Sequence, residues 1–151
     1  MVPRLPALLA TAAVGAAAAL TGGAPPASAA ANPYTAAQVC GAGYKVYVRR
    51  PVNFGTKVYG SLVLLHNAGA GKYCAVTRKT TFVGTPIWTD VSLRNERRKP
   101  QYVSDGKFYS YYAGPVYLPG KLGSCVHVMS SMQIPAKGTT LVAGSQEHFG
   151  C

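Results

Sequence analysis

The chain has 151 residues, enough for one small domain with a hydrophobic core, and a formal net charge of +11. Only 4 residues are acidic, against 15 lysines and arginines, so few side chains can accept a proton and catalysis is disfavoured. Glycine, tyrosine, valine, threonine and serine are plentiful, which favours strands and turns over helices.

Residues 1–29 have the features of a cleaved export signal. Arg4 supplies the positive charge, residues 5–20 are almost all leucine, alanine and valine, and Ala27-Ser28-Ala29 suits signal peptidase. The apolar run is shorter than the ~20 residues of a membrane span. We therefore predict secretion, and a mature chain (residues 30–151) that forms one domain without a membrane span. Arg4 is the only charged residue removed, so the formal charge becomes +10.

Four cysteines in an exported chain predict two disulfides, because nothing outside the cell keeps them reduced. Their spacing contains no C-x-x-C pair, which makes a zinc or redox site a poor interpretation. The four cysteines can pair in three ways, and we favour the pairing that closes the shorter loops and cross-links each half of the chain separately. It joins Cys40 to Cys74 and Cys125 to Cys151.

The first expected element is a single helical turn. Thr35 and Gln38 have the spacing of a capping box, and Gly41 can end the turn just after Cys40. Residues 44–49 then alternate in strand fashion.

Residues 58–80 predict the central β-hairpin of the domain. An apolar run at residues 62–65 enters a turn rich in glycine at residues 67–71, and the return strand carries Cys74. Residues 86–94 predict a half-buried strand, which places Trp88 on its polar face.

Further turns are expected in the second half of the chain. Asp105-Gly106, flanked by strand-forming residues, is typical of a two-residue hairpin loop. Pro119-Gly120 predicts another hairpin, and residues 139–142 predict a last strand. The expected fold is all-β, a small antiparallel sandwich or barrel of about eight short strands.

Three blocks of the chain are similar to a known family. They are NPYTAAQVCGAGYKV (residues 32–46), GKYCAVTRKT (71–80) and FYSYYAGPVY (108–117). These blocks and the order of the four cysteines resemble the family of spore-associated protein A of Streptomyces and its secreted actinobacterial relatives. The resemblance implies a small exported protein found with spores and cell surfaces, without an established catalytic activity.

A basic cluster, RNERRKP at residues 94–100, surrounds Glu96 with positive charge. Its cations are Arg94, Arg97, Arg98 and Lys99. Such a cluster can bind the phosphates of wall teichoic acid, lipid headgroups or nucleic acid. The alternative interpretation is a solvated loop between strands, whose charges discourage pairing at a sheet edge.

Several aromatic residues are candidates for a binding surface. Trp88, Tyr109 and Tyr111, with Tyr59 and Tyr117 nearby, can form a platform for sugar rings or bases. Tyrosine is also simply a good strand residue on a half-exposed sheet face.

Catalysis has one candidate pair. Glu147 and His148 would serve a microbial ribonuclease as base and acid, but adjacent residues on a strand point to opposite faces. His66, His127 and His148 are widely separated in the sequence and lack the close spacing of a metal site. We therefore expect no catalytic residue, no metal and no cofactor.

The sequence favours a secreted, non-catalytic protein of the spore or cell surface, which binds anionic wall polymers through a basic, tyrosine-rich surface. One alternative is a basic extracellular nuclease or toxin-like protein that acts on a polyanion. A second is a secreted protease inhibitor with its loop at residues 67–72 or 119–123. Nucleic acid is the less favoured polyanion, and the oligomeric state is left open.

Overall fold

The computed structural model describes residues 30–97 and 101–151. The predicted signal peptide, residues 1–29, lies outside the described residues. Within them the chain forms one short helix and eight strands, which confirms the all-β prediction. The elements are α1 (Ala36–Cys40), β1 (Lys45–Phe54), β2 (Lys57–Asn67), β3 (Lys72–Lys79), β4 (Ile87–Asn95), β5 (Tyr102–Tyr109), β6 (Tyr112–Pro119), β7 (Val126–Ala136) and β8 (Thr139–Phe149).

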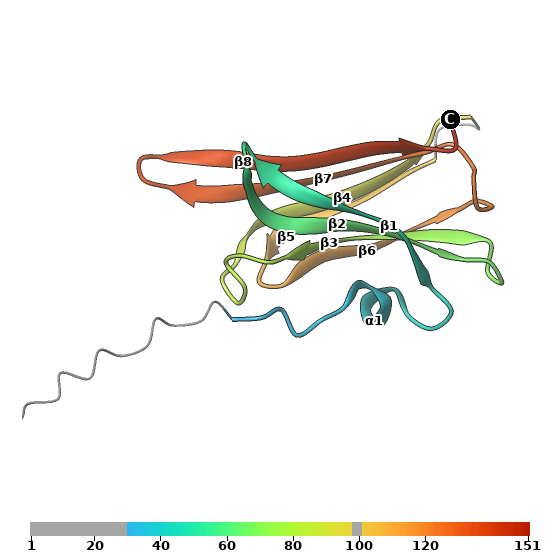
Figure 1. The fold of residues 1–151 in the computed structure, drawn as a ribbon, viewed down its shortest axis with the longest axis horizontal. Helices are drawn as coiled ribbons and strands as arrows, with labels where there is room; N and C mark the ends of the chain where they lie inside the picture. Colours follow the sequence, from blue (N-terminus) through green and yellow to red (C-terminus); the bar gives the residue numbers. More distant parts are fainter. Residues whose placement is uncertain (1–29, 98–100) are drawn as a thin grey trace, which may run out of the picture.

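The strands form one antiparallel sheet in the order β5-β4-β7-β8-β1-β2-β3-β6. This sheet curls into a nearly closed, flattened barrel, with β7 and β8 in one layer and β2, β3 and β6 in the other (Figure 1). β8 and β1 share a single residue pair, Asn53 with Gly144, so the two layers are loosely joined there. At the other side β5 runs through a tight turn into β6, which pairs with β3.

The main hydrophobic core fills the space between the two layers. β4 shows why the sequence folds this way, because its residues alternate between the core and the outside. Ile87, Val91 and Leu93 are buried, whereas Trp88 and Ser92 are half-exposed, as the sequence predicted. The other layer contributes mainly Val52, Leu62, Leu64, Tyr73 and Ala75 to this core.

A second, smaller core lies outside the barrel, beneath α1. The capping box of Thr35 and Gln38 is present, so the expected helical turn is confirmed. Cys40 bonds Cys74, and the second disulfide joins Cys125 to Cys151, as we favoured. α1 thereby covers the outer side of the β2–β3 hairpin. The buried residues of this core are Ala36, Cys40, Val63, Leu65, Cys74 and Val76.

Two predicted hairpins are wrong. Asp105 and Gly106 lie inside β5, where they face Val91 and Asp90 of β4 in an uninterrupted ladder. The Asp105 carboxylate accepts hydrogen bonds from Tyr109 and Gly114 and does not stabilise a turn at Asp105-Gly106. Nor do the strands around Pro119-Gly120 pair with each other, because β6 joins β3 while β7 joins β4 and β8.

Asp105 and a buried lysine close the barrel between β5 and β6. The Asp105 carboxylate accepts the Tyr109 hydroxyl (2.6 Å) and the Gly114 backbone N–H (2.7 Å). Lys79 of β3 is fully buried, and its ammonium donates to the carbonyl oxygens of Tyr109 and Thr85. Burial lowers the pKa of Lys79 to about 8.

Among the described residues no helix is long and apolar enough to cross a membrane.

Candidate functional site

The outer face of the layer formed by β5, β4, β7 and β8 is the candidate functional surface, here called the open face. α1 contacts only strands of the other layer among its principal contacts, so it does not cover the open face. Phe108 and Tyr102 are 67% and 61% exposed. Strand alternation and register place these residues on it: Tyr102, Ser104, Gly106 and Phe108 of β5; Trp88, Asp90, Ser92 and Arg94 of β4; His127, Met129 and Ser131 of β7; Gly144, Gln146 and His148 of β8.

One end of the open face is aromatic. Trp88 lies opposite Phe108 across the β4–β5 ladder, and their rings meet edge to face with centroids 5.7 Å apart. Phe108 and Tyr102 were not predicted to lie on this face, because the turn expected at Asp105-Gly106 divides the alternation of this strand.

The middle of the open face is a shallow polar groove of about 360 Å³. Its depth follows from Gly106, which has no side chain between Trp88 and Asp90. Asp90 is held in place, because its carboxylate accepts the backbone N–H (2.7 Å) and the hydroxyl (2.6 Å) of Ser131. Tyr102, Ser92, Ser104 and Met129 also line the groove.

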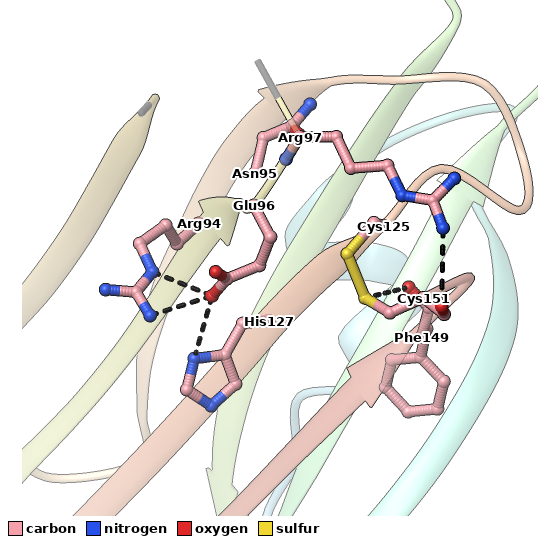
Figure 2. Close-up of a disulfide and its surroundings, with 8 residues drawn as sticks. All are labelled: Arg94, Asn95, Glu96, Arg97, Cys125, His127, Phe149 and Cys151. Carbon is pink, nitrogen blue, oxygen red and sulfur yellow. Dashed lines mark hydrogen bonds and ion pairs between the residues drawn. A yellow bond between two sulfur atoms is a disulfide. The ribbon is translucent and has the colours of Figure 1, made fainter. Parts of the chain in front are cut away.

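The other end of the open face is basic. Arg94 lies opposite Tyr102 in the β4–β5 ladder. Two nitrogens of its guanidinium donate hydrogen bonds to the same oxygen of Glu96, at 2.9 and 2.7 Å. Arg97 is exposed and reaches over the Cys125–Cys151 disulfide to the Cys151 main-chain oxygen (Figure 2). The structure thus gathers Arg94 and Arg97 at one end of the sheet, while the other two predicted cations, Arg98 and Lys99, lie outside the described residues.

Most of the positive charge has no carboxylate beside it. Asp90 and Asp105 are bonded to uncharged groups. Within residues 30–97 and 101–151, Arg50 and Arg94 are the cations with a carboxylate partner, in Glu147 and Glu96 respectively. The basic character expected from composition therefore persists at the surface of the folded chain.

Two histidines widely separated in sequence meet at the basic end. His127 and His148 are directly opposite in the β7–β8 ladder, and their rings stack with centroids 3.9 Å apart. Glu96 lies beside them, with its Oε1 3.6 Å from Nδ1 of His127 (Figure 2). The sequence did not predict this cluster. It could have been found from the Lys137-Gly138 turn, because both histidines lie ten residues from that turn and a hairpin sets such positions opposite each other.

The surroundings of His127 favour its neutral form. The residue is 8% exposed, and burial, followed by the charges of His148 and Arg94, lowers its pKa. Its buried Nε2 has no hydrogen-bond partner among the described residues, and leaving a polar group unpaired costs about 1–3 kcal/mol. The pKa of Glu96 is also lowered, chiefly by the hydrogen bond from Arg94.

The structure does not bring together the predicted nuclease pair. Glu147 points away from the open face and pairs with Arg50 at 2.9 Å, while His148 stacks on His127. His66 is buried against Tyr73 and its Nε2 lies 3.0 Å from the Gly120 carbonyl oxygen, so it fixes a loop.

The predicted aromatic platform is also dispersed. Trp88 lies on the open face, whereas Tyr109 packs against the main core, where burial and Asp105 raise its pKa to about 12. Tyr111 lies at the β5–β6 turn against Tyr34. Tyr59 is buried, and the hydroxyl of Tyr117 donates to the Cys40 carbonyl.

Comparison with known proteins finds one similar curated protein. The chain is 39% identical over 88 residues to spore-associated protein A of Streptomyces coelicolor. The match covers 58% of this chain and 53% of that protein, so the chain spans about half the length of its relative. This similarity confirms the predicted resemblance and supports a relation to that family. No protein-family model and no solved structure matches the chain.

Proposed function

We propose that this relative of spore-associated protein A is a secreted, non-catalytic protein of the spore or cell surface, and that it binds anionic wall polymers along the open face. The name of the relative and the two disulfides support a location outside the cytoplasm. The observation that carries the binding proposal is the open face itself, which is aromatic at one end, polar in the middle and basic at the other.

Sugar rings fit the aromatic end and the groove. The rings of Trp88 and Phe108 offer apolar surface against which the C–H face of a sugar can pack. The hydroxyls of Ser92 and Ser104 and the fixed carboxylate of Asp90 can bond sugar hydroxyls in the groove.

Phosphate groups fit the basic end. Arg94 lies six residues along β4 from Trp88, a span of about 20 Å, so one polymer can contact both ends of the open face. Arginine binds phosphate with two parallel hydrogen bonds. Arg97 is exposed at this end, where its guanidinium donates to the Cys151 main-chain oxygen and has no Asp or Glu partner among the described residues. The net positive charge draws a polyanion to the surface from a distance.

The proposal predicts salt-sensitive binding to cell walls. Residues 30–151 are expected to co-sediment with purified actinomycete walls at low salt, and to be released at high salt or when teichoic acids have been extracted. The double variant Arg97→Ala/Arg98→Ala should weaken binding about tenfold, because two phosphate contacts are lost. Trp88→Ala should weaken it several-fold with little change in its salt dependence.

The matched control is Lys45→Ala/Arg49→Ala, which removes the same charge from exposed positions on β1, in the other layer. It should change binding less than twofold. Equal losses in the two double variants would show that net charge alone drives binding and would contradict a site on the open face. Failure to bind walls under any condition would contradict the polymer proposal altogether.

The non-catalytic part of the proposal predicts a negative result with RNA. Glu147 and His148 face apart, and the Glu96 oxygen that lies near His127 also accepts two hydrogen bonds from Arg94, so neither carboxylate is free to act as a base beside a histidine. Residues 30–151 should leave no cleared zone in a gel that contains RNA. Clearing that disappears in His148→Ala would establish the alternative, a basic extracellular nuclease.

A further inference from the structure

We propose that Glu96, His127 and His148 form a three-ligand site for a divalent transition metal of the Zn²⁺ type. Each residue offers one ligand atom, and these atoms all lie within 4.8 Å of one another. This inference goes beyond polymer binding and does not depend on it.

The three side chains are held by backbone structure. The β7–β8 ladder sets His127 directly against His148, and the Cys125–Cys151 disulfide ties the same two strands just beyond that pair. The backbone N–H of Glu96 donates to the Cys125 carbonyl at 3.3 Å, which brings the end of β4 to the same place. A metal would therefore meet ligands from three strands that the fold has already gathered.

The chemistry of the donors suits zinc. Two imidazole nitrogens and one carboxylate oxygen are common ligands of Zn²⁺, and three protein ligands leave a fourth position for solvent or another ligand. Histidine, through a ring nitrogen, is the commonest side-chain ligand of such metals.

His127 supplies an independent observation. It is more than nine-tenths buried, its Nε2 has no hydrogen-bond partner, and its Nδ1 approaches Glu96 only to 3.6 Å. Buried polar side chains nearly always have a partner, and an orphaned one calls for an explanation. A metal would bond Nδ1, the ring nitrogen that faces Glu96, in a side chain that makes no hydrogen bond within the described residues, while Nε2 on the other side of the ring would stay unpaired.

The geometry needs only a small adjustment. Metal bonds of 2.0–2.2 Å place neighbouring donor atoms about 3.3 Å apart, close to the 3.6 Å that separates Glu96 and His127. His148 is exposed, so its ring can rotate out of the parallel stack to complete the site. Arg94 would remain on Glu96 as an outer contact that orients the carboxylate.

Isothermal titration of residues 30–151 with Zn²⁺, using protein without a histidine tag, tests the proposal. We expect one site per chain, and visible absorption typical of nitrogen-ligated cobalt when Co²⁺ replaces Zn²⁺. His148→Ala should weaken Zn²⁺ binding at least 30-fold and abolish the cobalt spectrum. His148 is the variant of choice because it is exposed and its loss leaves the core intact.

Gln146→Ala is the matched control, since Gln146 is exposed on the same face of β8, two residues away. It should change the affinity less than twofold. No heat of binding with Zn²⁺ or Cu²⁺ would overturn the proposal. Unchanged binding in His148→Ala, with the protein folded by circular dichroism, would do the same.

Discussion

Replacing both Cys40 and Cys74 by alanine is expected to lower the free energy of unfolding by about 4 kcal/mol. The disulfide joins residues 34 positions apart, and freeing such a loop restores chain entropy to the unfolded state. Both cysteines are buried in the outer core, where Cys40 ends α1 and Cys74 lies beneath it, and a helix of five residues cannot persist without an anchor. Guanidinium denaturation followed by circular dichroism, with the variant and the parent compared at one pH, measures the loss.

The second disulfide provides the comparison. Cys125→Ala/Cys151→Ala opens a loop of similar length, whose cysteines are 26 positions apart, and should cost nearly as much stability. Only the Cys40→Ala/Cys74→Ala variant should release α1, which hydrogen exchange at residues 36–40 would detect. A loss below about 1 kcal/mol, or equal exchange of α1 in both variants, would contradict the view that Cys40–Cys74 holds the outer core.

Asp105→Ala is expected to cost about 3 kcal/mol, although Asp105 is only partly buried. Its carboxylate bonds the Tyr109 hydroxyl and the Gly114 N–H, and hydrogen bonds to a charged group contribute about 1.5–3 kcal/mol each. No strand ladder joins β5 to β6 among the described residues, so the Gly114 bond links the two strands across that side of the barrel, while the Tyr109 bond, within β5, holds the carboxylate in place. Urea denaturation at neutral pH measures the effect.

Two variants make this prediction specific. Tyr109→Phe removes one of the two bonds and should cost about 1 kcal/mol. Glu147→Ala removes an acid that forms a surface ion pair with Arg50, and should cost less than 1 kcal/mol, because exposed pairs contribute little. If Asp105→Ala were no more harmful than Glu147→Ala, the barrel would not depend on Asp105 for its closure.

Local signals in the sequence predicted the parts of the fold that depend on neighbours in the chain. The capping box around Thr35 and the alternation of β4 depend on residues a few positions apart, and both were predicted correctly. The disulfide pairing followed from loop length. Asp105-Gly106 misled the prediction because turn propensity is weak, and two distant partners, β4 and Gly114, hold this segment extended.

The candidate site depends on register between strands, which a single sequence does not reveal. Trp88 and Arg94 were singled out correctly as residues of a polar strand face, but their neighbours Phe108 and Tyr102 belong to a strand that was divided by a false turn. His127 and His148 meet only because the β7–β8 hairpin turns midway between them. The twenty residues between His127 and His148 give no local sign in the sequence that the two imidazole rings stack.

The strands are synthesised in an order that differs from the order in which they pair. β1, β2 and β3 are complete at Lys79, but the free edge of β3 is covered only when β6 arrives, after β4 and β5. Until then β3 presents unpaired backbone groups, the feature through which separate chains join edge to edge. Between the completion of β3 and the docking of β6, the growing chain is therefore open to self-association along the edge of β3, and β6 closes that edge.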